Sequence, residues 1–236
     1  MRRIRGILFD KDGTLIDFDA TWAAVARKMA LTAAAGDEDA AGRLLDLSGF
    51  DAASGRFRAD SVFAAGTNAE VVALWHPRLD PEALAETVAA YDAVSAREGA
   101  ASAVALPGIR DAVARLHDAG YRLGMATNDS TLGAERTLVA LGFAHMFAAA
   151  YGYDAVARPK PAPDVVVAFA DMAGLRPSNI AMVGDNRHDL ETGRAAGAGL
   201  VVGVLSGTGT RETLGPLADV IVDSVADLPD LLAQRG

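Results

Sequence analysis

The sequence has no cysteine among its 236 residues and no hydrophobic run long enough to span a bilayer. The absence of cysteine excludes disulfides, thiolate nucleophiles and cysteine-based zinc sites. The apolar run behind the basic N-terminus stops at Asp10, so no signal peptide is expected either. The net charge of −9 argues against general binding to nucleic acid or to anionic membranes. We expect a cytoplasmic protein, monomer or homodimer, that holds any anionic ligand through local cations or a metal.

Short apolar segments and helical patterns alternate along most of the chain. The apolar segments are rich in branched side chains and lack polar alternation, which is typical of strands buried on both faces. They cover residues 4–9, 122–126, 180–183, 200–205 and 220–222. The helical patterns between them cover residues 108–119, 132–141, 163–173 and 190–196. This alternation predicts an α/β fold with a doubly wound parallel sheet, that is, a Rossmann-like core.

Residues 18–101 interrupt this alternation. They are rich in alanine, contain no convincing strand and pass through a predicted loop at 48–58. Their helical patterns cover residues 21–34, 70–75 and 81–97. We expect these residues to form an inserted all-helical cap domain, with the core made of residues 1–17 and 102–236.

Polar residues follow three of the predicted strands at the point where each strand ends. Asp10 and Asp12 follow the first strand and precede a glycine turn. Thr127 and Asn128 follow the strand at 122–126, and Asp185 follows the one at 180–183. Because ligands bind beyond the carboxyl ends of strands in open parallel sheets, these groups are expected at one edge of the sheet. A strand gains nothing from ending on paired carboxylates, so an electrophile or a cation is their expected partner.

Four segments, in this order, resemble the motifs of the haloacid dehalogenase-like hydrolase superfamily. They are Asp10-Lys11-Asp12-Gly13-Thr14, Thr127-Asn128, Lys160-Pro161 and Gly184-Asp185-Asn186-Arg187-His188-Asp189. The helical insertion between the first two is similar to the cap of the phosphoglycolate phosphatase-like branch. Lys11 departs from the pattern, because relatives usually carry an apolar residue at that position.

The resemblance implies a phosphatase that hydrolyses a small phosphate monoester, phosphoglycolate-like or a sugar phosphate, through an aspartyl-phosphate intermediate. Asp10 would be the nucleophile. Asp12 would protonate the leaving alcohol and later deprotonate the hydrolytic water. Lys160 would neutralise charge on the nucleophile and the phosphate. The partner implied is a small soluble molecule, with no nucleic acid and no membrane.

The resemblance also implies Mg²⁺ as cofactor, since hard oxygen ligands with few carboxylates suit that ion. Its protein ligands would be the carboxylates of Asp10 and Asp185 and the backbone carbonyl of Asp12. Asp189 would orient this metal shell or Lys160 from outside it. The groups expected to hold the phosphate are Gly13, Thr127, Asn128 and Lys160.

The cap is where substrate specificity is expected, because a phosphate-binding edge alone cannot discriminate between leaving groups. Arg56 and Arg58 lie in the predicted loop at 48–58 and are the candidates to contact the substrate. In a protein this acidic, a second anionic group on the substrate needs local cations to attract it.

Three other functions are compatible with parts of this pattern. A phosphomutase of the β-phosphoglucomutase type would share all four motifs and would transfer the phosphoryl group to a second sugar. A dehalogenase is disfavoured by Asp12 and Gly13, because a departing halide needs no protonation and relatives of that type lack the second aspartate. A catalytically idle binding protein is disfavoured by the intact set of Asp10, Asp12, Lys160 and Asp185.

Overall fold

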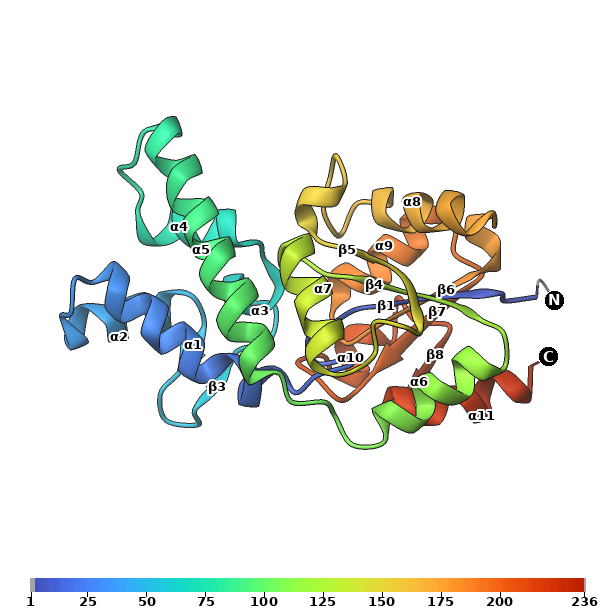
Figure 1. The fold of residues 1–236 in the computed structure, drawn as a ribbon. Helices are drawn as coiled ribbons and strands as arrows, with labels where there is room; N and C mark the ends of the chain where they lie inside the picture. Colours follow the sequence, from blue (N-terminus) through green and yellow to red (C-terminus); the bar gives the residue numbers. More distant parts are fainter. Residues whose placement is uncertain (1–2, 236) are drawn as a thin grey trace.

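A parallel six-stranded sheet forms the centre of the larger part of the molecule (Figure 1). The computed structural model describes residues 3–235. The sheet order is β5-β4-β1-β6-β7-β8, and each neighbouring pair is parallel. The strands are β1 Gly6–Phe9, β4 Arg122–Ala126, β5 Phe147–Tyr151, β6 Ile180–Gly184, β7 Leu200–Val204 and β8 Val220–Val222. Because β1 is central and the chain proceeds outward on both sides of it, the predicted doubly wound fold is confirmed.

Helices cover both faces of this sheet, which is why its strands are apolar without alternation. On one face, Ile7 and Phe9 of β1 pack with α6, α7 and α11. On the other, Leu8 packs with α8, and α9 and α10 pack there against β7. The helices are α6 Ile109–Asp118, α7 Thr131–Ala140, α8 Asp164–Ala173, α9 Arg187–Ala196, α10 Arg211–Leu214 and α11 Leu228–Ala233. Short 3₁₀ turns lie at η1 Tyr153–Ala155, η2 Pro177–Asn179 and η3 Val225–Asp227.

The cap is a second layer of helices with its own hydrophobic core, built on Phe18, Trp22, Val25 and Trp75. Its elements are α1 Phe18–Ala33, α2 Glu38–Leu47, β2 Phe50–Asp51, β3 Arg56–Phe57, α3 Val62–Ala65, α4 Asn68–Trp75 and α5 Pro81–Ser102. Two linkers join the cap to the core and run side by side, since the Asp17 N–H donates to the Val104 carbonyl at 2.8 Å. No helix within residues 3–235 is long and apolar enough to cross a membrane.

Three strands, β2, β3 and β5, differ from the sequence-based expectation. The segment expected as a loop at 48–58 contains the β2–β3 hairpin, so the cap is not all-helical. Phe50 and Phe57 face each other across this hairpin with ring centroids 5.1 Å apart, and Gly55 takes the positive φ of 72° that its turn requires. Strand β5 was not expected, because Phe147–Tyr151 is dominated by alanine and lacks branched side chains.

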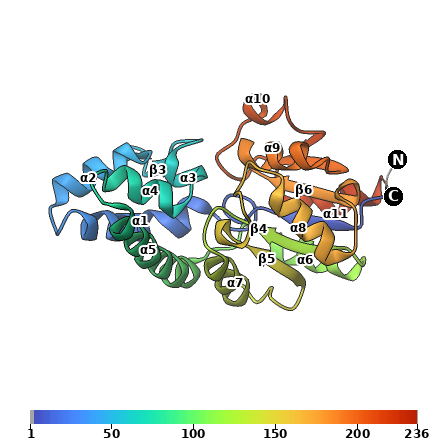
Figure 2. The ribbon, with the colours of Figure 1, turned by 90° about the horizontal axis from the view of Figure 1, so that it is seen from above.

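The cap lies beyond the carboxyl ends of the strands in both views of the ribbon (Figures 1 and 2). The neighbours of β1 are β4 and β6, one from each half of the sheet. The chain therefore fills the sheet outward on one side of β1 through β4 and β5, and on the other side through β6, β7 and β8. Folds of this kind bind ligands in the crevice outside the carboxyl end of the strand at which the two halves meet.

Candidate active site

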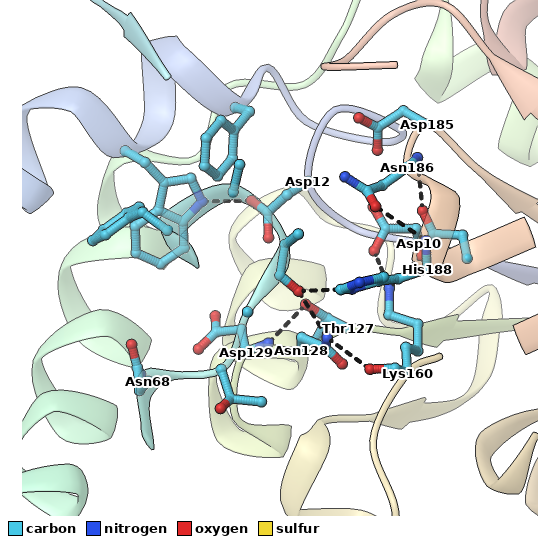
Figure 3. A pocket seen from close by; sticks show the side chains of 18 of the residues that line it. Asp10, Asp12, Asn68, Thr127, Asn128, Asp129, Lys160, Asp185, Asn186 and His188 are labelled. Atoms are coloured by element: carbon cyan, nitrogen blue, oxygen red, sulfur yellow. Dashed lines mark hydrogen bonds and ion pairs between the residues drawn. The ribbon is translucent and has the colours of Figure 1, made fainter. Parts of the chain in front are cut away.

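The strand register brings the predicted polar residues to one level of the sheet. Phe9 of β1 pairs with Met125 of β4 and with Val183 of β6. The residues that follow these strands therefore meet at one edge, around a single pocket (Figure 3). The residues predicted from the motifs that line it are Asp10, Asp12, Thr127, Asn128, Lys160, Asp185 and Asp189.

Lys160 links two of the carboxylates. Its ammonium group lies 2.6 Å from Asp10 Oδ1 and 2.6 Å from Asp189 Oδ1, and it also donates to the Ala126 carbonyl at 3.1 Å. Burial alone would lower the pKa of Lys160, but the two carboxylates raise it above its ordinary value. The side chain is therefore a permanently charged cation fixed beside Asp10.

The carboxylates here carry more negative charge than Lys160 can balance. Burial raises the pKa of Asp10 to about 6, and repulsion from Asp189 adds to that shift while Lys160 opposes it. Burial also raises the pKa of Asp185 well above its usual range, and repulsion from Asp10 and Asp189 acts in the same direction. Such an uncompensated cluster of hard oxygen atoms fits a divalent cation.

Three carboxylates have oxygen atoms that all lie within 4.8 Å of one another: Asp10, Asp185 and Asp189. Both oxygens of Asp189 already have partners, because Oδ1 accepts from Lys160 and Oδ2 accepts from the Asn186 N–H at 3.0 Å. Asp189 is thus placed to hold Lys160 and the start of α9. Lys160 contacts Asp10 through one oxygen, Oδ1. The oxygens of Asp185 accept from uncharged groups, the Thr14 hydroxyl at 3.3 Å and the Thr208 N–H at 2.7 Å. Asp10 and Asp185 are therefore the carboxylates better placed to contact a metal directly.

The glycine turn after β1 is required by the closeness of Asp185. Gly13 has a φ of 74°, and a Cβ there would come within 2.6 Å of Asp185 Oδ2. Asp185 Oδ2 also accepts from the Thr208 N–H at 2.7 Å, and the Ser206 hydroxyl donates to the Gly13 carbonyl at 2.7 Å. Sequence reasoning missed this contribution of the loop after β7, although its place after a predicted strand was the signal that could have revealed it.

Asn128 connects the site to the cap. Its side-chain amide donates to the Ala65 carbonyl of the cap at 2.9 Å and to the Lys160 carbonyl at 3.2 Å. The His188 ring nitrogen Nδ1 also lies 3.4 Å from the Ala65 carbonyl. Two core side chains thus fix the end of α3 over the pocket. The Thr127 hydroxyl accepts from the Asp129 N–H at 3.0 Å, which orients it at the end of β4.

The two arginines expected to contact the substrate lie elsewhere. The Arg56 guanidinium pairs with Asp19 at 2.8 Å, and Arg58 pairs with Asp46 at 3.0 Å, both on the exposed surface of the cap. Neither side chain lines the pocket that contains Asp10. The structure therefore does not bring Arg56 and Arg58 together with the other predicted site residues, and their role in specificity stays a prediction.

The cap instead presents a mainly apolar wall. Its pocket-lining residues are Phe18, Trp22, Phe63, Ala64, Ala65, Gly66, Thr67, Asn68 and Val71. None of these was predicted, since an apolar residue of a helix is most simply explained as core packing. The pocket between these residues and the core is small, with a volume of about 60 Å³.

Lys11, the residue that departs from the family pattern, is a buried cation next to the pocket. Its ammonium group lies 2.6 Å from Asp129 Oδ2 and 3.2 Å from Asp12 Oδ2. Burial alone would lower the pKa of Lys11, but these two carboxylates raise it above its ordinary value. Asp129 in turn accepts from the Ser95 hydroxyl of α5 at 3.3 Å. This network spans the boundary between core and cap.

Lys11→Met is expected to lower the free energy of unfolding by about 3 kcal/mol, because it leaves the largely buried Asp129 carboxylate without its counterion. The double variant Lys11→Met/Asp129→Asn should recover most of that loss, as no unpaired charge remains at Asp129. Urea unfolding of both variants measures this coupling. Lys28→Met, which breaks the exposed pair with Glu98, is the control and should cost less than about 1 kcal/mol. Strictly additive losses in the double variant would contradict the expected pairing.

Comparison with known proteins agrees with this geometry. A family model described as haloacid dehalogenase-like hydrolase matches residues 4–197. The phosphoglycolate phosphatase of Salmonella typhimurium is 31% identical over 239 residues, covering 97% of this chain and 92% of the relative. The phosphoglycolate phosphatase of Escherichia coli K12 is also 31% identical, with 95% and 91% covered.

Two crystal structures have the same fold as this chain. A predicted phosphoglycolate phosphatase from Haemophilus somnus superposes with a TM-score of 0.71 at 22% identity, with 97% of both chains covered. CbbY from Rhodobacter sphaeroides, solved in complex with phosphate, gives a TM-score of 0.68 at 22% identity, with 95% of this chain and 96% of the other covered. At these identities the likeness concerns the fold. With the family match and the curated relatives, the chain belongs to the haloacid dehalogenase-like hydrolases and is a phosphatase, a hydrolase of phosphoric monoesters.

Proposed function

We propose that this phosphatase hydrolyses a small, phosphoglycolate-like monoester through an aspartyl-phosphate on Asp10, with Mg²⁺ as cofactor. The observation that carries the proposal is the placement of Asp10, which contacts the buried Lys160 cation at 2.6 Å and shares one pocket with Asp12. A carboxylate attacks phosphorus only when charge repulsion with the phosphate is cancelled, and Lys160 supplies part of that cancellation.

The chemistry takes two steps. A carboxylate oxygen of Asp10 bonds to phosphorus while the bond from phosphorus to the alcohol oxygen breaks, and Asp12 gives its proton to that departing oxygen. In the second step Asp12 takes a proton from water as the water oxygen bonds to phosphorus and the bond from phosphorus to the Asp10 oxygen breaks, which releases inorganic phosphate and restores the Asp10 carboxylate. Splitting the reaction in this way returns both aspartates to their starting state.

Other residues of the site hold the reacting groups in place. We assign the Thr127 hydroxyl and the main-chain amide N–H of Asn128 to the phosphoryl oxygens, because both residues line the pocket beside Asp10. The turn at Gly13, which directly follows Asp12, is assigned to the same role. Asp189 keeps Lys160 directed at Asp10 through its 2.6 Å ion pair. A Mg²⁺ ion held by Asp10, Asp185 and the Asp12 backbone carbonyl would neutralise the phosphate charge that Lys160 leaves uncompensated.

The proposed substrate class rests on pocket size and on the curated relatives. The pocket beneath the cap has a volume of only about 60 Å³, which favours a short leaving group over a large one. The curated relatives that are 31% identical are phosphoglycolate phosphatases. Arg56 and Arg58 on the cap surface are our candidates for selecting a second anionic group on the substrate.

A substrate panel tests the proposal. The purified protein is assayed with p-nitrophenyl phosphate, 2-phosphoglycolate and several sugar phosphates, each with Mg²⁺ and with excess EDTA. We expect Mg²⁺-dependent release of phosphate from the monoesters, with kcat/KM highest for 2-phosphoglycolate. Conversion of one sugar phosphate into its isomer without net release of phosphate would favour a mutase instead. Full activity in excess EDTA would contradict the assignment of the cofactor.

A further inference from the structure

The Asp12 carboxylate has a hydrogen-bond partner that comes from the cap. Trp22, in α1, donates its indole N–H to Asp12 Oδ1 at 2.5 Å. Trp22 is 5% exposed and forms part of the pocket wall. An indole has one polar hydrogen and cannot accept a hydrogen bond, so this contact can hold only an oxygen that serves as an acceptor.

The indole ring is fixed by its surroundings, so the direction of its N–H is fixed as well. Behind it lies Gly99 of α5, where a Cβ would come within 2.7 Å of the Trp22 ring. Phe63 packs against it edge-on with centroids 6.3 Å apart. The Lys11 ammonium group lies over its face, 4.8 Å from the centroid. The helix α5 therefore carries glycine where a larger side chain would displace the indole.

The second oxygen of Asp12 is held less firmly. Its partner is Lys11, at 3.2 Å from Oδ2, and that ammonium group makes its shorter contact with Asp129 at 2.6 Å. Figure 3 shows that one oxygen of Asp12 accepts the hydrogen bond from the cap and that the other oxygen is directed into the pocket. The two oxygens of this carboxylate are thus not equivalent, and only one of them faces the space for a leaving group.

We propose that Trp22 is a positioning residue for Asp12. Its indole N–H fixes Oδ1, so Oδ2 is the oxygen that gives a proton to the departing alcohol as the bond to phosphorus breaks. The same Oδ2 then takes a proton from the water that attacks the phosphorylated Asp10. This inference rests on the proposed function, because it assigns the proton transfers of that mechanism to one atom of Asp12.

Trp22→Phe tests the inference, because it keeps an aromatic ring in the wall and removes the N–H. The readout is kcat/KM for phenyl phosphate divided by kcat/KM for p-nitrophenyl phosphate. The two leaving groups share a ring, but p-nitrophenolate departs readily without a proton and phenolate depends more on the acid. We expect this quotient to fall by roughly tenfold, mostly through kcat. The quotient is independent of the fraction of protein that is folded, so a loss of stability cannot imitate the effect.

Trp75→Phe is the matched control. Its indole N–H donates to the Ser48 hydroxyl and the Leu44 carbonyl inside the cap, away from the pocket. The control should leave the quotient unchanged whatever it does to stability. If Trp22→Phe lowers both substrates equally, or neither, Trp22 does not position Asp12 and the inference fails alone. If the wild-type protein with Mg²⁺ hydrolyses neither ester, the proposed function itself fails and the inference falls with it.

Discussion

Asp10→Asn is expected to remove phosphatase activity, with kcat falling on the order of 10⁴-fold or more. The amide has nearly the shape of the carboxylate but is a far weaker nucleophile, and no other carboxylate can take its place against the phosphorus. Asp189 is tied to Lys160 and the start of α9, and Asp185 is tied to the loop after β7. Each tenfold loss corresponds to about 1.4 kcal/mol of barrier.

The same variant should fold normally, which separates lost chemistry from lost structure. Burial and the charge of Asp189 disfavour the ionised form of Asp10, so a neutral amide relieves repulsion within the cluster. Lys160 keeps its ion pair with Asp189. We therefore expect a Tm no lower than that of the wild-type protein.

Two measurements check the result. Acid quenching after mixing with ³²P-labelled substrate should leave label on the wild-type protein and none on Asp10→Asn. Asp171→Asn, which removes a charge from the exposed side of α8, is the control and should retain full activity. If Asp10→Asn kept half of the wild-type activity, the covalent mechanism would be abandoned.

The sequence alone was enough to predict which polar residues meet at the carboxyl edge of the sheet. Strand ends are recognisable locally, because an apolar run that stops at a polar residue marks both the strand and its carboxyl end. Because the strands are parallel and in this register, Asp10, Thr127 and Asp185 must all lie at the same edge of the sheet. That inference needs no knowledge of side-chain packing.

Contacts between distant segments could not be predicted in this way. Lys11 and Asp129 are 118 positions apart, and nothing local to either residue indicates that they pair. Trp22 has the spacing of a core residue on α1 and is indeed buried, yet its single polar hydrogen is directed at Asp12. A periodic pattern reports which face of a helix is buried and carries no information on which polar atom at the edge of that face meets a partner.

For Arg56 and Arg58 the sequence predicts a contact with the substrate, whereas the structure pairs both side chains with carboxylates on the surface of the cap. Arg56 and Arg58 are cations with glycine and aromatic neighbours, a composition that predicts contact with an anionic substrate. In the β2–β3 hairpin Arg56 lies opposite Asp51, and its guanidinium pairs with Asp19 on the surface. Composition indicates where charge is available, whereas the turn of a short hairpin decides which way each side chain faces.

Asp185→Asn is expected to raise the Mg²⁺ concentration needed for half-maximal activity by about 100-fold or more, because it removes one of the two carboxylates placed to contact the ion directly. The amide can still accept the Thr208 N–H, so the loop after β7 keeps its position. Ca²⁺ should inhibit the wild-type protein, since its larger and looser coordination shell would misplace the attacking oxygen.

A thermal-shift measurement checks metal binding without any turnover. Mg²⁺ at about 100 times its Kd should stabilise the wild-type protein by roughly 2.7 kcal/mol, and the same concentration should leave Asp185→Asn almost unchanged. Without metal, Asp185→Asn should be at least as stable as the wild-type protein. The Asp185 carboxylate is repelled by Asp10 and Asp189, and the neutral amide that replaces it is free of that repulsion. Asp171→Asn serves again as control and should respond to Mg²⁺ as the wild-type protein does. An equal response to Mg²⁺ in Asp185→Asn would show that the ion binds elsewhere, and the carboxylate cluster would then need another explanation for its excess charge.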